Sequence, residues 1–208
     1  MRSSSAVAVT RAYSIANRPE DVGRAVFNIR LAVPPAGQEQ EVPPGVVSSW
    51  LFARRPGDKV EASGPFGDFH VQPTQREMVF IGGGVGMAPL RAMIHEQIGA
   101  GTDRKMRFFY GARARRLICS MSMSLRRLRK RSEFHMDTGA FRSRARRPLA
   151  GATGFIHDTV RAAMSKHPAP EDCEYYLCGP PIMISAVLHT LAKLGVEPAS
   201  IFNDDFGG

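Results

Sequence analysis

Apolar runs and amphipathic stretches alternate along the second half of the chain. Strands are predicted at four short apolar runs, Met78–Ile81, Met106–Tyr110, Glu174–Leu177 and Ser200–Asn203. Apolar residues at helical spacing lie between these runs and predict helices at Ala88–Ile98, after Gly154 and at Ile182–Leu194. Strands that alternate with helices are typical of an α/β domain with a mostly parallel sheet.

The first part of the chain follows a different pattern. Alternating and short apolar runs predict strands at Val26–Val33 and Val60–Ala62, and turns rich in Pro, Gly and Ser separate them. We therefore expect two domains: a small antiparallel β domain over residues 1–73 and an α/β domain over residues 74–208.

A glycine-rich turn, with the sequence IGGGVGMAPL at Ile81–Leu90, joins the first predicted strand of the α/β domain to its helix. Its glycines allow backbone conformations and close approaches that a Cβ would prevent. The free amides at the start of the following helix are a site for a phosphate, and a proline in the first helical turn loses no hydrogen bond. The expected binding residues are Gly82, Gly83, Gly84, Gly86, Met87 and Pro89. A plain tight turn is the alternative interpretation.

Two more motifs directly follow predicted strands, Gly111-Ala112-Arg113 and Cys178-Gly179-Pro180-Pro181. Ligands of parallel sheets bind at the carboxyl ends of the strands, where all three motifs fall. Together they predict a dinucleotide site, with further binding residues Gly111, Arg113, Cys178, Gly179 and Pro180. Considered alone, Cys178 is better interpreted as a small buried strand residue; the CGPP context favours the binding role instead.

Two motifs in the first domain suit a second cofactor. In Arg11-Ala12-Tyr13-Ser14, the arginine can pair with a phosphate, the tyrosine can lie flat on a ring system and the serine can donate to a ring nitrogen. A helix predicted to extend through Phe52 begins near Gly45, Ser48 and Ser49, which form a second candidate anion site. The alternatives are a half-buried strand tyrosine and an ordinary helix N-cap.

Composition and charge narrow the class of protein. The 208 residues carry a net charge of +9, and 12 Lys and Arg against two acids lie within Arg113–Arg147. An arm that binds phosphate backbones is one interpretation of this basic segment. The segment matches no recognisable nucleic-acid module, however, so we expect no nucleic-acid partner.

Three cysteines without a CxxC pair argue against a metal site or a disulfide scaffold. No apolar run is long enough to span a membrane, so we expect a soluble, cytoplasmic protein.

Together these motifs resemble the ferredoxin–NADP reductase superfamily, and within it the F subunits of sodium-translocating NADH:quinone reductases. The resemblance rests on RAYSIA, PPGVVSSW, SGPFGDF, VFIGGGVGMAPLR, YGAR, APEDCEYYLCGPP and NDDFGG, and it covers Arg11–Arg113 and Gly151–Gly208. It implies a partial antiparallel FAD-binding β domain followed by a Rossmann-like NADH-binding domain. In the family this unit passes a hydride from NADH to FAD, and the flavin passes single electrons to an iron–sulfur cluster and onward to quinone.

The resemblance also implies roles for individual residues. Arg11 would bind the flavin phosphate, while Tyr13 would stack on the isoalloxazine and Ser14 would reach its N5 edge. The FAD pyrophosphate would lie on Gly45, Ser48 and Ser49, and NADH would lie on the glycine-rich turn. The implied catalytic residues are Tyr13, Ser14, Cys178 beside the nicotinamide, and Phe206 as a cover for the flavin. The implied partners are the other subunits of the membrane enzyme, at the cytoplasmic side of the bacterial inner membrane.

The chain departs from the family in two places. The family's membrane anchor, four-cysteine iron–sulfur domain and first barrel strands are missing before the tetrad, so we expect a truncated module. Residues 114–150 are basic where the family is acidic and aromatic. Synonymous codons for Ile118–Leu125 and Ser132–Arg147, read in other frames, give the family-like MFYVDEF and PNFTWTLALSDPAPED. We interpret this stretch as frame-shifted sequence that reduces stability; a genuine basic helical insertion is the alternative.

Two other functions remain open at this point. The chain resembles the reductase components of multicomponent oxygenases through the same superfamily motifs. A non-catalytic basic binding protein on a degenerate scaffold would instead use the charged segment, and its binding would weaken steeply with salt.

Overall fold

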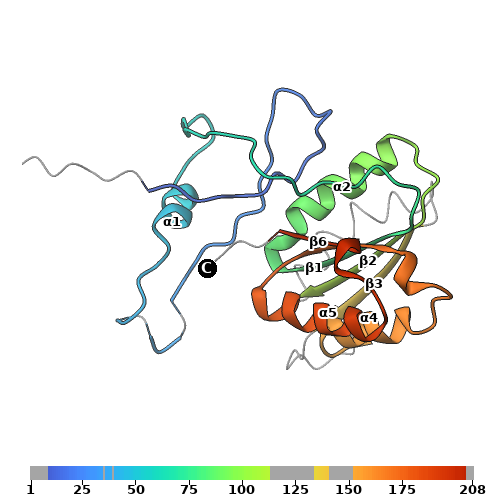
Figure 1. Cartoon of the computed structure of the whole chain (residues 1–208). Coiled ribbons are helices and arrows are strands. Elements are labelled where there is room, and N and C mark those ends of the chain that lie inside the picture. The colour runs from blue at the N-terminus through green and yellow to red at the C-terminus, as the bar shows by residue number, and fades with distance from the viewer. Residues whose placement is uncertain (1–8, 35, 39, 113–133, 141–151, 205–208) are drawn as a thin grey trace, which may run out of the picture.

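The computed structural model describes residues 9–34, 36–38, 40–112, 134–140 and 152–204, with the backbone alone for 112, 134–140 and 152–153. A six-stranded sheet of order β4-β3-β2-β1-β5-β6 forms the centre of the α/β domain (Figure 1). All five neighbouring pairs are parallel. The strands are β1 (Met78–Gly83), β2 (Met106–Ala112), β3 (Phe134–Ala140), β4 (Ala152–Thr153), β5 (Glu174–Cys178) and β6 (Ile201–Asp204).

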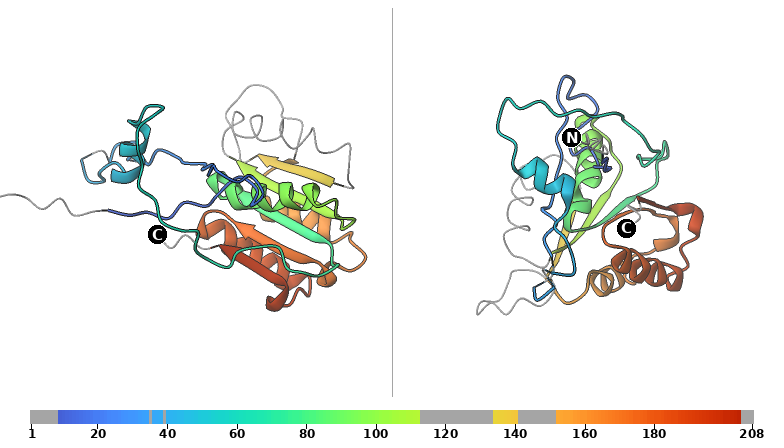
Figure 2. Two further views of the ribbon diagram at one scale, coloured as in Figure 1. Left: turned by 90° about the horizontal axis from the view of Figure 1, so that it is seen from above. Right: turned by 90° about the vertical axis from the view of Figure 1, so that its left-hand side faces the viewer.

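Helices cover both faces of the sheet. Helix α2 (Met87–Gly99) lies on one face, and α4 (Ile156–Met164) and α5 (Pro181–Lys193) lie on the other (Figures 1 and 2). Side chains alternate between the faces of a strand, so Met78 and Phe80 of β1 pack in the α2 cluster while Val79 and Ile81 pack with α4 and α5. A strand covered on both faces is apolar without interruption, which explains the fully buried run of β1.

The α/β domain confirms the predicted parallel sheet. All four predicted strands and three predicted helices form; the strands and the helices at Ala88–Ile98 and Ile182–Leu194 lie within two residues of their expected ends, and the helix expected after Gly154 begins at Ile156. Short 3-10 turns at Gly84–Gly86, Pro170–Asp172 and Pro198–Ser200 connect several of them. Strand β1 extends beyond its apolar run because Gly82 and Gly83 continue the pairing with Tyr110 and Gly111.

Strand β3 lies inside the basic segment, where the sequence predicted no strand. It pairs with β2 from Met106↔Phe134 to Ala112↔Ala140, so at least this part of residues 114–150 has a place in the sheet. This pairing argues against the expectation that the segment does not pack with the domain. The frame-shift interpretation itself concerns the gene and stays a prediction, and residues 113–133 and 141–151 lie outside the described part of the chain.

The first domain differs from its predicted secondary structure. Neither Val26–Val33 nor Val60–Ala62 forms a strand, and one antiparallel bridge, Ile15↔Phe27, is the only strand pairing within the described residues before Met78. An extended segment becomes a strand only when a neighbour completes its hydrogen bonds, and an isolated pair is marginal in water. The predicted helix is present as α1 (Val46–Phe52).

The Asn17 side chain shapes a turn of the first domain, and a hydrogen bond from Arg91 attaches that domain to α2. The side chain of Asn17, 7% exposed, accepts a 2.6 Å hydrogen bond from the Val26 amide and donates to the Arg24 carbonyl, which closes the turn after the bridge. Arg91 of α2 donates to the Ala16 carbonyl. These contacts hold the segment that carries Tyr13 and Ser14 against the α/β domain.

A buried ion pair anchors the linker between the two domains. The Arg104 guanidinium lies 2.7 Å from a Glu174 carboxylate oxygen, and their side chains are 5% and 2% exposed. Arg104 also donates to the carbonyls of Gln72 and Arg76, while Thr74 donates to Glu174. A buried charge pair is tolerated only when its hydrogen bonds are satisfied, and here the linker backbone supplies several of the partners.

Candidate active site

The glycine-rich turn lies at the carboxyl end of β1 and leads directly into α2. Gly84 has φ +60°, a left-handed conformation that favours glycine, and a Cβ built on it would meet no atom within 4 Å. The Tyr110 hydroxyl donates a 2.9 Å hydrogen bond to the Gly84 carbonyl. Burial raises the pKa of Tyr110 to about 12, so the phenol keeps the proton that it donates. The hydrogen bond from Tyr110 of β2 therefore fixes the turn on its sheet side, while no neighbouring atom of the described residues covers the side to which a Cβ on Gly84 would point.

The end of β5 lies directly against this turn. A Cβ on Gly86 would lie 2.4 Å from the Cys178 carbonyl oxygen and 2.7 Å from the Gly179 amide nitrogen, so only glycine permits this approach. Met183, in the first turn of α5, covers both Gly83 and Gly179, where added Cβ atoms would lie within 2.6 Å of its side chain. The backbones of the two motifs therefore form one surface.

The third predicted motif joins the same edge of the sheet. Gly83 pairs with Gly111 of β2, and Gly82 pairs with Cys178 of β5. The side chain of Ile156, which begins α4, lies 3.2 Å from an added Cβ at Gly111. The predicted convergence of the three motifs at the carboxyl ends of the strands is confirmed for these residues.

Asp204 links the two domains at the site. It ends β6 opposite Cys178, and one of its carboxylate oxygens accepts a 3.3 Å hydrogen bond from the Ser14 hydroxyl. Cys178 is fully buried, and burial together with the nearby Asp204 charge raises the pKa of its thiol to about 12. Cys178 therefore stays a neutral thiol at physiological pH and places no charge beside a bound ligand.

The other residues of the tetrad lie at the surface of the first domain. Tyr13 is half-buried, and Arg11 is exposed with its guanidinium donating a 2.8 Å hydrogen bond to the Thr10 carbonyl. The structure thus brings Ser14 into contact with the α/β domain and leaves Arg11 exposed.

The second candidate anion site differs from its expected geometry. The Ser48 hydroxyl is buried, donates to the Gly45 carbonyl at 3.1 Å and accepts from the Ala32 amide at 3.2 Å. It therefore shapes the turn before α1 and does not point outward with the helix amides, contrary to the expectation from the sequence. Gly45 itself has no room for a Cβ, because Ala32 and Ser48 each lie 2.7 Å from that position. Ser49 follows in α1 and is half-buried.

Two predicted site residues cannot be placed. Arg113 and Phe206 lie outside the described residues, so their roles stay predictions. Conversely, sequence reasoning assigned no role to Asp204, Tyr110 or Met183. For Asp204 the sequence offered one signal, its position directly before the family-like residues DFGG. The contacts of Tyr110 and Met183 depend on the fold, so no local signal could have found them.

A cluster of metal-ligating residue types lies at the opposite edge of the sheet. Single ligand atoms of Glu77, His167 and Cys173 lie within 4.8 Å of one another. His167 already accepts the Ala169 amide at Nδ1 and faces the Glu77 carboxylate at 3.1 Å through Nε2, and Arg107 forms an ion pair with the same carboxylate. A histidine that binds a metal through one nitrogen donates from the other, which the Ala169 contact prevents. The cluster is a closed hydrogen-bond network.

This combination of a parallel sheet and a glycine-rich turn at the strand ends is typical of dinucleotide-binding domains, and comparison with known proteins agrees. The model for the oxidoreductase FAD-binding domain matches residues 2–71, and the model for the oxidoreductase NAD-binding domain matches residues 80–189. The chain belongs to the oxidoreductase NAD-binding domain family.

Sequence relatives narrow the resemblance. The chain is 48% identical over 200 residues to the F subunit of the Na(+)-translocating NADH-quinone reductase of Methylococcus capsulatus, across 95% of this chain and 49% of that protein. It is 46% identical over 202 residues to the protein of the same name in Pseudomonas aeruginosa, with 96% and 49% covered. The chain thus spans about half the length of these relatives, and the resemblance to the F subunits is confirmed.

Solved structures agree on the fold. A ferredoxin reductase in carbazole 1,9a-dioxygenase has a TM-score of 0.72 and 30% identity, over 96% of this chain and 56% of that one. The cytochrome b5 reductase domain of Ulva prolifera nitrate reductase has a TM-score of 0.75 at 21% identity, over 94% and 77%. Of the described helices, none combines the length and the apolar character that a membrane crossing requires.

Proposed function

We propose that this chain is the NADH-oxidising flavoprotein module of a sodium-translocating NADH:quinone reductase, in which hydride passes from NADH to FAD. One observation carries the proposal: the glycine-rich turn, Cys178 and Asp204 meet at one edge of the sheet, and Ser14 of the first domain is hydrogen-bonded to that edge. The relatives of twice this length, which are F subunits of such enzymes, support the same conclusion.

The glycine-rich turn suits the pyrophosphate of NADH. Its outer side is open at Gly84, and the amino-terminal end of α2, which favours an anion, follows directly. Pro89 occupies the first turn of the helix, where a missing N–H removes no hydrogen bond. The residues proposed to hold NADH are Gly82, Gly83, Gly84, Gly86, Met87, Pro89, Gly111, Arg113, Gly179 and Pro180.

The first domain would hold FAD beside this site. Arg11 is exposed and would meet a phosphate, Tyr13 is half-buried, and Ser14 has a hydroxyl oriented by Asp204. We propose that Gly45 and Ser49 contact the FAD pyrophosphate while Ser48 holds their turn in shape. Phe206 would cover the flavin.

The two cofactors supply the redox chemistry when bound, and the chain orients them and excludes water. A buried, neutral Cys178 offers a small, uncharged side chain on which a nicotinamide ring could lie. Ser14 can donate a hydrogen bond at the flavin only by releasing Asp204, so the pair forms a polar contact at the meeting point of the cofactors.

Onward electron transfer would need partners. We propose that the flavin passes single electrons towards quinone through an iron–sulfur cluster that these 208 residues do not supply. The partners would be the other subunits of a membrane enzyme, at the cytoplasmic side of the inner membrane. The 30% identity to a ferredoxin reductase in carbazole 1,9a-dioxygenase favours an oxygenase reductase as the second candidate, but the relatives among the F subunits are more similar.

Flavin loading and NADH oxidation test the proposal directly. The full chain is purified with added FAD, and NADH is then added without oxygen while the visible flavin absorption is followed. We expect a bound flavin whose absorption bleaches as NADH is consumed. A chain that binds no flavin, or a bound flavin that NADH leaves unchanged, would refute the function for this chain.

Two cysteine variants show whether the site itself is responsible. Cys178→Ala removes the thiol at the strand edge, and we expect bleaching to slow by roughly tenfold to a hundredfold, as for small misplacements of reacting groups. Cys173→Ala is the matched control, since Cys173 is also buried with a raised pKa but lies at the opposite edge of the sheet. Equal slowing in both variants would assign the effect to stability.

A further inference from the structure

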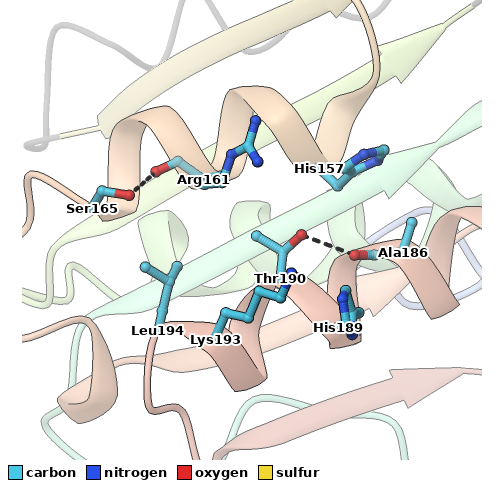
Figure 3. Close-up of a pocket in the computed structure, with 8 residues that line it drawn as sticks. All are labelled: His157, Arg161, Ser165, Ala186, His189, Thr190, Lys193 and Leu194. Atoms are coloured by element: carbon cyan, nitrogen blue, oxygen red, sulfur yellow. Dashed lines mark hydrogen bonds between the residues drawn. The ribbon is translucent and has the colours of Figure 1, made fainter.

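A recess lies between α4 and α5, on the sheet face opposite α2 (Figure 3). Its volume is about 380 Å³, within the range of small-molecule sites. The eight described residues that line it are His157, Arg161, Ser165, Ala186, His189, Thr190, Lys193 and Leu194, and none of them is acidic. We call this feature the α4–α5 recess.

Helical spacing produces the recess. His157, Arg161 and Ser165 are four residues apart along α4 and its C-terminal end, so they line one wall. His189 and Lys193 are four residues apart on α5 and line the other wall, as the sticks in Figure 3 show. Four nitrogen-bearing side chains therefore face one space from two helices.

The polar groups of the recess suit an anion. Arg161 is 64% exposed and has one partner, Asp158 at 2.8 Å, which also lies 3.8 Å from His157. The hydroxyls of Ser165 and Thr190 donate to the carbonyls of Arg161 and Ala186 (Figure 3), so the nitrogen groups are the available donors. A guanidinium and an ammonium on opposite walls match the several acceptor oxygens of a phosphate better than the two of a carboxylate.

We propose that the α4–α5 recess binds a small, soluble organic phosphate. Ala186 and Leu194 add apolar surface between the charged groups, which a bare phosphate would not use. The recess lies on the sheet face opposite α2 and shares no lining residue with the proposed NADH site, so the two sites are distinct. The inference does not depend on NADH oxidation by this chain.

Phenyl phosphate is the test ligand, because it combines a phosphate with a small apolar group. Its binding to the full chain is measured by calorimetry at constant ionic strength, with inorganic phosphate and benzoate for comparison. We expect phenyl phosphate to bind more tightly than either. Amide chemical shifts should move in α4 and α5, both with and without saturating NADH. Shifts confined to the glycine-rich turn, or no binding of phenyl phosphate, would overturn the proposal.

Charge-removing variants localise the site. Lys193→Gln and Arg161→Gln each remove one exposed cation from the recess, and we expect each to weaken phenyl phosphate binding about fivefold. Lys59→Gln makes the same change of charge in an exposed turn of the first domain and should leave the affinity within about twofold. Equal affinities in all variants would contradict the assignment. If the chain bound phosphatidylglycerol vesicles but not phenyl phosphate, the proposal of a soluble ligand would be overturned in favour of a lipid surface.

Discussion

Gly86→Ala tests the contact on which the candidate active site depends. The added Cβ would lie 2.4 Å from the Cys178 carbonyl oxygen and 2.5 Å from its carbon, where ordinary contacts begin near 3.4 Å. Both neighbours are backbone atoms of a fully buried strand, so no side-chain rotation relieves the overlap. The turn and the end of β5 must separate by about 1 Å, a displacement that costs on the order of a hundredfold in rate when it misplaces reacting groups.

The assay measures NADH affinity by calorimetry and, on flavin-loaded protein, the rate of anaerobic flavin bleaching. We expect the bleaching rate to fall about a hundredfold and NADH affinity to fall about tenfold or more. Gly101→Ala is the control: Gly101 lies in the turn after α2 with φ +68°, so an alanine there strains the backbone locally, but its Cβ meets no atom of the described residues within 4 Å and touches no strand end. If Gly86→Ala binds and oxidises NADH at rates within twofold of the unmodified chain, the close approach is irrelevant to function.

Three further predictions concern stability and reactivity. Arg104→Met leaves Glu174 buried without its cation, and urea unfolding should show a loss of about 3–5 kcal/mol; exposed Arg55→Met should cost little, and equal losses would contradict this. Burial raises the pKa of Glu77, but hydrogen bonds from Arg107 and His167 outweigh burial and lower it. The stability that Glu77 contributes is therefore present at pH 7 and lost as the pH falls below about 4.5. Glu77→Gln should accordingly be less stable than the unmodified chain at pH 7 and approach it in acid, and a gap that widens in acid would refute the sign. Cys178, buried and with a pKa raised to about 12, should resist iodoacetamide at about pH 8 until urea unfolds the chain, and rapid labelling of the native protein would contradict its burial.

Local pattern was sufficient for the elements of the α/β domain. The strand at Met78–Gly83 is buried on both faces, so its apolar run has no competing interpretation once length and flanking glycines are considered. The glycine-rich turn was recognisable because its chemistry is contained in ten consecutive residues. Strand β3 was missed because it lies in a segment whose charges obscure any strand pattern, and its pairing with β2 is set by the sheet.

The first domain shows the opposite case. The alternation at Val26–Val33 was a correct description of the sequence and a wrong prediction of structure, because a strand also requires a neighbour. Ser48 is similar: its position before a helix suggested an outward hydroxyl, while the close approach of Ala32 turned it towards the backbone. Neither neighbour can be read from adjacent residues.

The sequence by itself determined the class of the protein, four of the six strands and the three helices of the α/β domain, and the three motifs at the strand ends. Those features depend on residues close together in the chain, whose periodicity and glycine content act locally. Only the tertiary structure decided that Gly86 lies against Cys178, that Asp204 receives the Ser14 hydroxyl, and that α4 and α5 enclose a basic recess. Such contacts join residues up to 190 positions apart, and sheet order and helix packing, which no local pattern encodes, bring them together.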